Sequence, residues 1–182
     1  MAIQVTYRRT SRLSMRIVKN GDVHVSAPIG IPKKKVKAFI YEHRDWIVEA
    51  RKKTQERVQA RADFYEKLPL TTRKQRDEAK EQLKEIIEPM IQKYAEKMGV
   101  TPGAITFKKM VSRWGQCDVK THHICFSIYV LLLPDWCKEH IVVHELCHLL
   151  EPSHNTRFHT LMAQYFPRWR EARKQTRQLL TT

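Results

Sequence analysis

The sequence predicts an α+β fold, in which strands and helices are interleaved along the chain. Apolar and polar residues alternate over residues 3–7 and 15–18, as they do in half-buried strands. From residue 33 onwards apolar residues recur at intervals of three, four and seven, which is the period of an amphipathic helix. Alternation returns after residue 101 and gives way to helical spacing again after Pro134.

The N-terminal strands are expected to form a small antiparallel sheet that contains a β-hairpin. Asn20 and Gly21 separate the strand over residues 15–18 from a third strand over residues 23–25. An Asn-Gly pair between alternating segments is a strong signal for a hairpin turn.

Two long helices are expected to follow. The first begins near Lys33 and reaches at least Arg51, and a charged, less periodic continuation runs to Glu66. The pair Leu68-Pro69 ends that segment. We therefore expect residues 1–68 to form the N-terminal strands and a basic helix, and residues 69–182 to form the core, within one continuous domain.

The second long helix is expected to begin at Thr72, because Thr72 and Gln75 have the spacing of a capping box. It ends at Gly99, a residue type favoured just beyond a helix C-terminus. Pro89 within it predicts a kink or a short break. Its buried face is expected to comprise Ala79, Leu83, Ile87, Met90, Tyr94 and Met98.

The second half of the chain is expected to contain two strands and three helices. The strands lie over residues 105–111 and 124–130, separated by a loop that contains Trp114-Gly115 and His122-His123. Pro134 and Asp135 favour a helix start, since Pro suits the first turn and an acidic side chain suits the positive end. This helix carries residues 141–150, and two more are expected over residues 156–165 and 167–180.

Length and composition exclude several classes of protein. A chain of 182 residues with 42% hydrophobic residues can bury a core, and five Gly and eight Pro exclude collagen-like and low-complexity sequences. The four Cys include no CxxC pair, so we expect free thiols in a reducing compartment. The most apolar stretch, residues 124–133, is shorter than the roughly 20 residues of a membrane span, and the N-terminus lacks a signal peptide. We therefore expect a soluble, cytoplasmic protein with no membrane partner.

The net charge is strongly positive. Lys and Arg total 34 against 19 Asp and Glu, which gives a formal net charge of +15 and a pI near 9.9. Residues 1–40 contain nine of the basic residues and one acidic residue, Asp22. This balance suits a phosphate-bearing partner, such as a nucleotide or nucleic acid bound through the basic N-terminal half. It is equally typical of solvated helix faces.

The segment His144-Glu145-Leu146-Cys147-His148 has the pattern H-E-x-x-H within a predicted helix. Two His four residues apart lie on one face of a helix, so both imidazoles can bind one metal ion. Glu145 lies on a neighbouring face, from which its carboxylate can reach a metal-bound water as a general base. Neutral imidazoles suit Zn²⁺, and a catalytic zinc site has three protein ligands and a water. The pattern also arises by chance, but in this apolar setting unpaired polar side chains are costly without a metal.

A third ligand follows shortly after the motif. His154 comes six residues after His148, and residues 151–153 end the helix and allow the chain to turn back. His159, five residues further along, is the alternative third ligand. The spacing therefore predicts one zinc ion per chain.

Several further segments carry a family resemblance. They are Ser112-Arg113-Trp114-Gly115-Gln116-Cys117, Ile124, Pro134, Val142-Val143 with the H-E-x-x-H motif, His154 and Phe158. Together with the N-terminal strands, Pro28 and the helix around Trp46, they resemble the YgjP-like metallopeptidase-domain family, which is related to the SprT-like and Wss1-like zincins. The resemblance implies a small zincin-like core, in which the H-E-x-x-H helix packs against a short mixed sheet. It also implies that His144, His148 and His154 are the zinc ligands and that Glu145 is the catalytic acid/base.

The chain departs from this family pattern beside the expected cleft. His122-His123 stand where the family tends to have a Gly, and Ser127 stands where it tends to have an Asn. We expect both His to be exposed loop residues; the alternative is that they add a polar contact at the site. In the turn over residues 113–115, Arg113 offers a cationic fork and Trp114 a stacking face to a substrate. Alternatively, Trp114 packs into the core and Arg113 caps a helix.

These features predict a zinc-dependent metallohydrolase. A zinc-bound water deprotonated by Glu145 would attack an electrophilic carbonyl or phosphoryl centre. A peptide bound along an edge strand is the favoured substrate, which makes the chain a metallopeptidase. One alternative is release of pyrophosphate from a nucleoside triphosphate such as UTP, an activity that the resemblance implies. Another is a DNA-associated protease like the SprT-like and Wss1-like relatives. A third is a binding module that a metal stabilises, but this alternative gives no role to Glu145.

Overall fold

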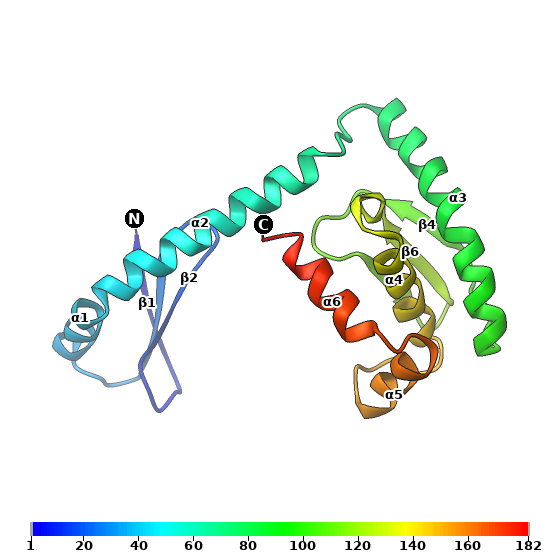
Figure 1. The fold of residues 1–182 in the computed structure, drawn as a ribbon. Coiled ribbons are helices and arrows are strands. Elements are labelled where there is room, and N and C mark those ends of the chain that lie inside the picture. Colours follow the sequence, from blue (N-terminus) through cyan, green and yellow to red (C-terminus); the bar gives the residue numbers. More distant parts are fainter. Residues whose placement is uncertain (1, 182) are drawn as a thin grey trace. The chain divides into compact units, whose positions relative to one another are not determined.

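The computed structural model describes residues 2–181, which divide into two compact units that we describe separately. The N-terminal unit comprises residues 2–64 with Leu180 and Thr181, and the C-terminal unit comprises Tyr65–Leu179. Strands and helices alternate along the described chain (Figure 1), so the predicted α+β class is confirmed. None of the described helices combines the length and the apolar character that crossing a membrane requires. The expected boundary between residues 68 and 69 stays a prediction.

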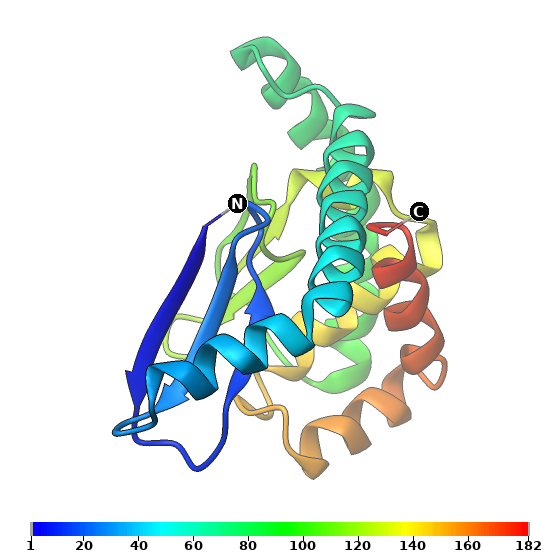
Figure 2. The same ribbon diagram turned by 90° about the vertical axis from the view of Figure 1, so that its left-hand side faces the viewer.

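The sheet of the N-terminal unit contains β1 (Ile3–Arg8), β2 (Ser14–Ile17) and β3 (Val23–Pro28) in the order β1-β3-β2 (Figure 2). The predicted hairpin is confirmed, because β2 and β3 pair antiparallel around a turn in which Gly21 has a φ of 83°. The expectation of a wholly antiparallel sheet is wrong, since β1 pairs with β3 in parallel. The chain reverses after β1 and again after β2, so β3 inserts between them in the direction of β1.

The first predicted helix is divided in two. Helices α1 (Lys33–Glu42) and α2 (Arg44–Glu66) are separated at His43, whose Nδ1 lies 2.8 Å from the carbonyl oxygen of Phe39. This side-chain contact occupies a carbonyl in the last turn of α1, at the point where the helix ends. Beneath the two helices lies a small core of buried residues: Val23, Val25 and Ala27 from β3, Val36 from α1 and Ile47 from α2.

Helix α3 (Arg73–Met98) of the C-terminal unit begins and ends as predicted. The Thr72 side chain accepts a hydrogen bond from the backbone N–H of Gln75, and Oε1 of Gln75 accepts one from the backbone N–H of Thr72, which completes the capping box. Gly99 follows the helix with a φ of 66°. The helix is continuous through Pro89, so no break occurs there. The expected buried face is formed, except that Ile91 is buried where Met90 was expected.

The second sheet contains β4 (Ile105–Lys108), β5 (Gly115–Asp118) and β6 (His123–Ser127) in the order β4-β6-β5. β4 pairs with β6 in parallel and β5 pairs with it antiparallel, so the sheet is mixed and β5 is an edge strand. β5 lies within the segment expected to be a loop. Its four residues include no large apolar side chain, and an edge strand that is only partly buried does not need the apolar alternation on which the prediction relied. β6 is shorter than expected, because a 3-10 helix, η1 (Ile128–Leu132), follows Ser127.

The remaining helices surround the predicted metal-binding segment. They are α4 (Asp135–Cys147), α5 (Thr156–Tyr165) and α6 (Trp169–Gln178), close to the expected bounds. α4 packs against α3, α5, α6 and β5, which makes it the central helix of this unit (Figure 1). The apolar residues Ile141, Val142, Val143 and Leu146 are buried in that packing. The first four residues of the H-E-x-x-H motif therefore lie on a helix that is packed on several sides, and His148 directly follows it.

Candidate metal centre

Three His side chains converge at one point in the C-terminal unit. His144 in α4, His148 directly after α4 and His154 before α5 each place one imidazole nitrogen within 4.8 Å of the others. The Nε2 atoms of His144 and His154 are 3.0 Å apart. Nitrogen ligands of a tetrahedral zinc ion are separated by roughly 3.3 Å, given Zn–N distances of about 2.0–2.1 Å. The arrangement therefore fits a single metal ion, and it is the only such group of three or more His, Cys, Asp or Glu within residues 2–181.

The end of α4 explains how the chain brings the third His back. The backbone N–H of Glu151 donates to the carbonyl of Cys147, which closes a turn beyond the last helical residue. The Asn155 side chain then accepts a hydrogen bond from the backbone N–H of Phe158 and starts α5. His148 Nδ1 lies 3.3 Å from the carbonyl oxygen of Glu151, to which only a protonated Nδ1 can donate. That contact leaves His148 Nε2 as the nitrogen available to a metal.

Phe158 forms an apolar floor under the three imidazoles. Its ring is 1% exposed, and its centroid lies 5.0, 4.7 and 4.7 Å from those of His144, His148 and His154. Burial lowers the pKa of all three side chains, that of His144 to about 3. The imidazoles are therefore neutral near pH 7, which is the protonation state that binds a metal.

Glu145 lies on the neighbouring face of α4, against β5, and is 4% exposed. A Cβ atom on residue 115 would lie 2.7 Å from both Cγ and Cδ of Glu145, so only a glycine at Gly115 leaves room for this carboxyl group. Burial raises the pKa of Glu145 to about 8, and the positive charge of Arg113 opposes that shift. The site thus pairs neutral imidazoles with a carboxyl group that can gain and lose a proton near neutral pH.

Two hollows meet at this centre, and both are lined by Arg113, Gly115, His144, Glu145 and His154. The larger, of about 700 Å³, extends towards α5 and α6. The smaller, of about 360 Å³, follows β5 past Gln116 and Cys117. They provide space for a substrate on two sides of the His cluster.

Arg113 and Trp114 both lie at the larger hollow, as the substrate-contact hypothesis requires. Arg113 donates a hydrogen bond of 2.8 Å to the side-chain oxygen of Gln116, rather than to a helix end. Trp114 is half-buried and packs against a core cluster that includes Tyr129, and its ring centroid is 6.4 Å from that of Tyr65. Trp114 therefore combines a packing role with a place in the lining.

The other His of the prediction lie outside the cluster. His159, the alternative third ligand, stacks on Trp169 with ring centroids 5.1 Å apart and an interplanar angle of 6°. His122 is an exposed loop residue, as expected, with a φ of 57°. His123 is instead half-buried at the start of β6, where its Nε2 lies 2.8 Å from Oγ1 of Thr106.

Sequence reasoning missed the residues of α6 that line the larger hollow. They are Trp169, Arg173, Thr176 and Arg177, joined by His140 from α4. The α6 residues follow one another at intervals of four, three and one, so they lie on one helical face. That spacing was readable in the sequence, but nothing in it indicated that this face would meet the H-E-x-x-H helix.

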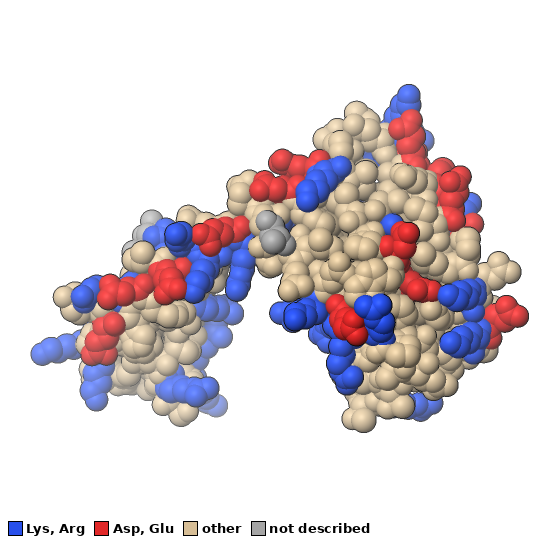
Figure 3. Space-filling view, viewed as in Figure 1, with Lys and Arg blue, Asp and Glu red and all other residues tan. Residues whose placement is uncertain are grey.

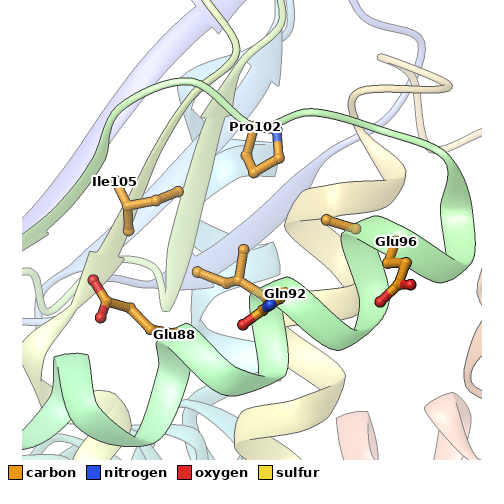
Figure 4. A pocket seen from close by; sticks show the side chains of 7 residues that line it. Glu88, Gln92, Glu96, Pro102 and Ile105 are labelled. Atoms are coloured by element: carbon orange, nitrogen blue, oxygen red, sulfur yellow. The ribbon is translucent and has the colours of Figure 1, made fainter.

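A further shallow hollow lies between α3 and β4 (Figure 4). Its lining includes Glu88, Gln92 and Glu96 of α3, together with Pro102 and Ile105. It shares no lining residue with the two hollows at the His cluster. We assign no chemistry to it.

Comparison with known proteins places the chain in a family. The model of the YgjP-like metallopeptidase domain matches residues 11–76 and 71–179. No curated protein matches the chain. Among solved structures, the chain is similar to the crystal structure of the metallopeptidase zymogen abylysin of Pyrococcus abyssi, with 21% identity and a TM-score of 0.46 over 50% of this chain and 90% of that one. Since the family model spans most of the sequence, including the H-E-x-x-H helix and the turn before β5, the chain belongs to the YgjP-like metallopeptidase-domain family.

Proposed function

We propose that this chain is a zinc-dependent metallopeptidase in which Glu145 is the general base. The observation that carries this proposal is the convergence of three neutral imidazoles beside one buried carboxyl group. His144, His148 and His154 would hold one zinc ion. When bound, zinc supplies a Lewis acid that polarises the substrate carbonyl and lowers the pKa of water.

Glu145 would accept a proton from the attacking water at its carboxylate and later donate it to the leaving amine. Its side chain extends from α4 and lies against Gly115, so the carboxyl group is held in one place, which proton transfer requires. Its burial disfavours the ionised form and so raises its pKa, while the carboxyl group still borders both hollows. Arg113, which opposes the raised pKa of Glu145, favours the ionised form needed for the first step.

The edge strand β5 supports a peptide as the substrate. The backbone of an edge strand has unpaired N–H and C=O groups that can pair with an extended chain. β5 has such an edge, because β6 lies on one side of it and no other strand pairs with it in the described part of the chain. The smaller hollow runs along β5 to the His cluster, so a peptide bound there would pass Glu145.

A second candidate function is release of pyrophosphate from a nucleoside triphosphate such as UTP. Three arginine side chains, Arg113, Arg173 and Arg177, line the larger hollow beside the same His cluster. A guanidinium group forms paired hydrogen bonds with phosphate oxygens, so these side chains would bind the triphosphate.

Nucleic acid is a further candidate partner, as it would be for a DNA-associated protease. Lys and Arg side chains are distributed over the visible surface of the N-terminal unit, with acidic side chains among them (Figure 3). In residues 1–40 they outnumber acidic residues nine to one. Binding through that unit would recruit the site to a target without changing its chemistry.

One parallel assay tests the proposed function. The zinc-loaded wild type and Glu145→Gln would each be given an unfolded protein and, separately, the four nucleoside triphosphates. We expect peptide cleavage by the wild type and none above background by Glu145→Gln. Pyrophosphate release without peptide cleavage would establish the second candidate instead, and equal cleavage by both proteins would contradict the proposed role of Glu145.

A further inference from the structure

The larger hollow has a cationic wall on the side formed by α6. Arg173 and Arg177 are one turn apart on the lining face of this helix, with Trp169 one turn before them. Arg113 adds a third guanidinium group from the turn before β5. Glu145 is the only acidic residue in the lining, so positive charge exceeds negative charge inside the hollow.

Arg173 is placed to act on a ligand near the His cluster. Its positive charge contributes to the lowered pKa of His140, His144 and His154, so it lies within electrostatic range of all three rings. No ion pair joins its guanidinium to an acidic side chain in residues 2–181. Glu171, on the same helix, is instead paired with Arg168 at 2.8 Å.

Two buried nitrogen atoms without hydrogen-bond partners belong to residues of the same lining. Within the described chain, His140 Nδ1 and Trp169 Nε1 are the buried side-chain nitrogen or oxygen atoms that lack a partner. Their residues are 5% and 7% exposed. His159 stacks on the Trp169 ring and the Arg170 guanidinium lies 4.6 Å from its centroid, so neighbouring side chains hold the indole while its N–H stays unpaired. Leaving a buried N–H such as that of Trp169 unpaired costs free energy, and a bound ion is one group that can satisfy such a donor.

We propose that Trp169, Arg173 and Arg177 form an anion subsite, which binds a carboxylate or phosphate group of the substrate beside the bond that is hydrolysed. This inference rests on the proposed function, because it assigns the subsite to the substrate of the same centre. The two hollows share Glu145, His144 and His154, so a substrate held along β5 would extend into this subsite. An acidic peptide side chain and the phosphates of a nucleotide are the two sources of such an anion.

The first test measures the affinity of the zinc-loaded protein for inorganic pyrophosphate by isothermal titration calorimetry. We expect Arg173→Gln and Arg177→Gln each to weaken binding about tenfold, because each removes charge-assisted hydrogen bonds. Lys174→Gln is the matched control, since it removes the same charge from an α6 residue outside the lining, and it should change the affinity less than about twofold. Trp169→Phe, which keeps the ring but removes the N–H, should weaken binding about threefold. Equal effects of Arg173→Gln, Arg177→Gln and Lys174→Gln would overturn the subsite.

The second test identifies the source of the anion. The wild type would be assayed on matched peptides that contain Asp or Asn near the scissile bond, and on UTP. A tenfold preference for Asp that disappears in Arg173→Gln identifies an acidic peptide; loss of UTP hydrolysis in Arg173→Gln without a peptide preference identifies a nucleotide. If the rate of peptide hydrolysis is the same for the Asp and Asn peptides and is unchanged in Arg173→Gln, the subsite is overturned and the proposed function stands. Pyrophosphate binding that depends on Arg173 in a protein that hydrolyses nothing would refute the proposed function and retain the subsite.

Discussion

Glu145→Gln should bind one zinc ion per chain, like the wild type, and lose about 10²–10⁴-fold in kcat. The substitution keeps the size of the side chain but removes its ability to accept a proton. Since Glu145 is not among the three converging His, the metal should remain. The measurements are zinc content by atomic emission, kcat on the substrate found active, and the thermal unfolding temperature. A variant with full zinc and undiminished kcat would contradict the mechanism.

Gly115→Ala provides an independent route to the same conclusion. It leaves Glu145 in the sequence but places a Cβ where its carboxyl group lies, so that group must move. A displacement of about 1 Å at a catalytic group can cost about 10²-fold in rate. We expect a loss of that size with zinc retained, whereas Val48→Ala, an exposed change in α2 outside both hollows, should have little effect. Equal activity of Gly115→Ala and Val48→Ala would mean that the position of Glu145 is unimportant.

His148→Ala should lose both zinc and activity. A zinc site that keeps only two of three imidazoles binds the metal far more weakly, because each ligand contributes directly to affinity. Zinc binding to the folded state also raises the unfolding temperature of the wild type, and that increase should be absent in His148→Ala. Zinc titration followed by thermal unfolding measures both effects.

His159→Ala is the control for this prediction. It removes an imidazole from the same region of the chain, but His159 stacks on Trp169 and is outside the cluster. It should therefore retain one zinc ion per chain and the zinc-dependent increase in unfolding temperature. Loss of zinc in His159→Ala, with zinc retained in His154→Ala, would reverse the assignment of the third ligand.

The parts of the site that depend on local spacing could be predicted from the sequence. Positions 144 and 148 share a face of any helix, and the apolar residues around them made a helix the expected structure. For His154 to come back to these two His, the helix had only to end before His154, and residues 151–153 favour such an end. The capping box at Thr72 is local in the same sense, since its partners are three residues apart.

The parts of the fold and the site that depend on contacts between distant segments could not be predicted from the sequence. The need for a glycine at Gly115 is visible only when β5 lies against α4. A Cβ atom at this position would clash with Glu145, which comes 30 positions later in the chain. The direction of β1 depends on which strand inserts beside it, and the alternation of its side chains is the same in parallel and antiparallel pairs. The basic residues of α6 are typical of a solvated helix surface, and only the structure shows that they line the larger hollow.

The most direct test of the central claim is zinc K-edge X-ray absorption on the zinc-loaded wild type. We expect nitrogen or oxygen scatterers alone at about 2.0–2.1 Å, with the multiple scattering of imidazole rings from three His. The four Cys of the chain provide a clear alternative, because a thiolate ligand would add a sulfur shell at about 2.3 Å. A sulfur shell, or a spectrum without imidazole scattering, would contradict a metal centre built from His144, His148 and His154.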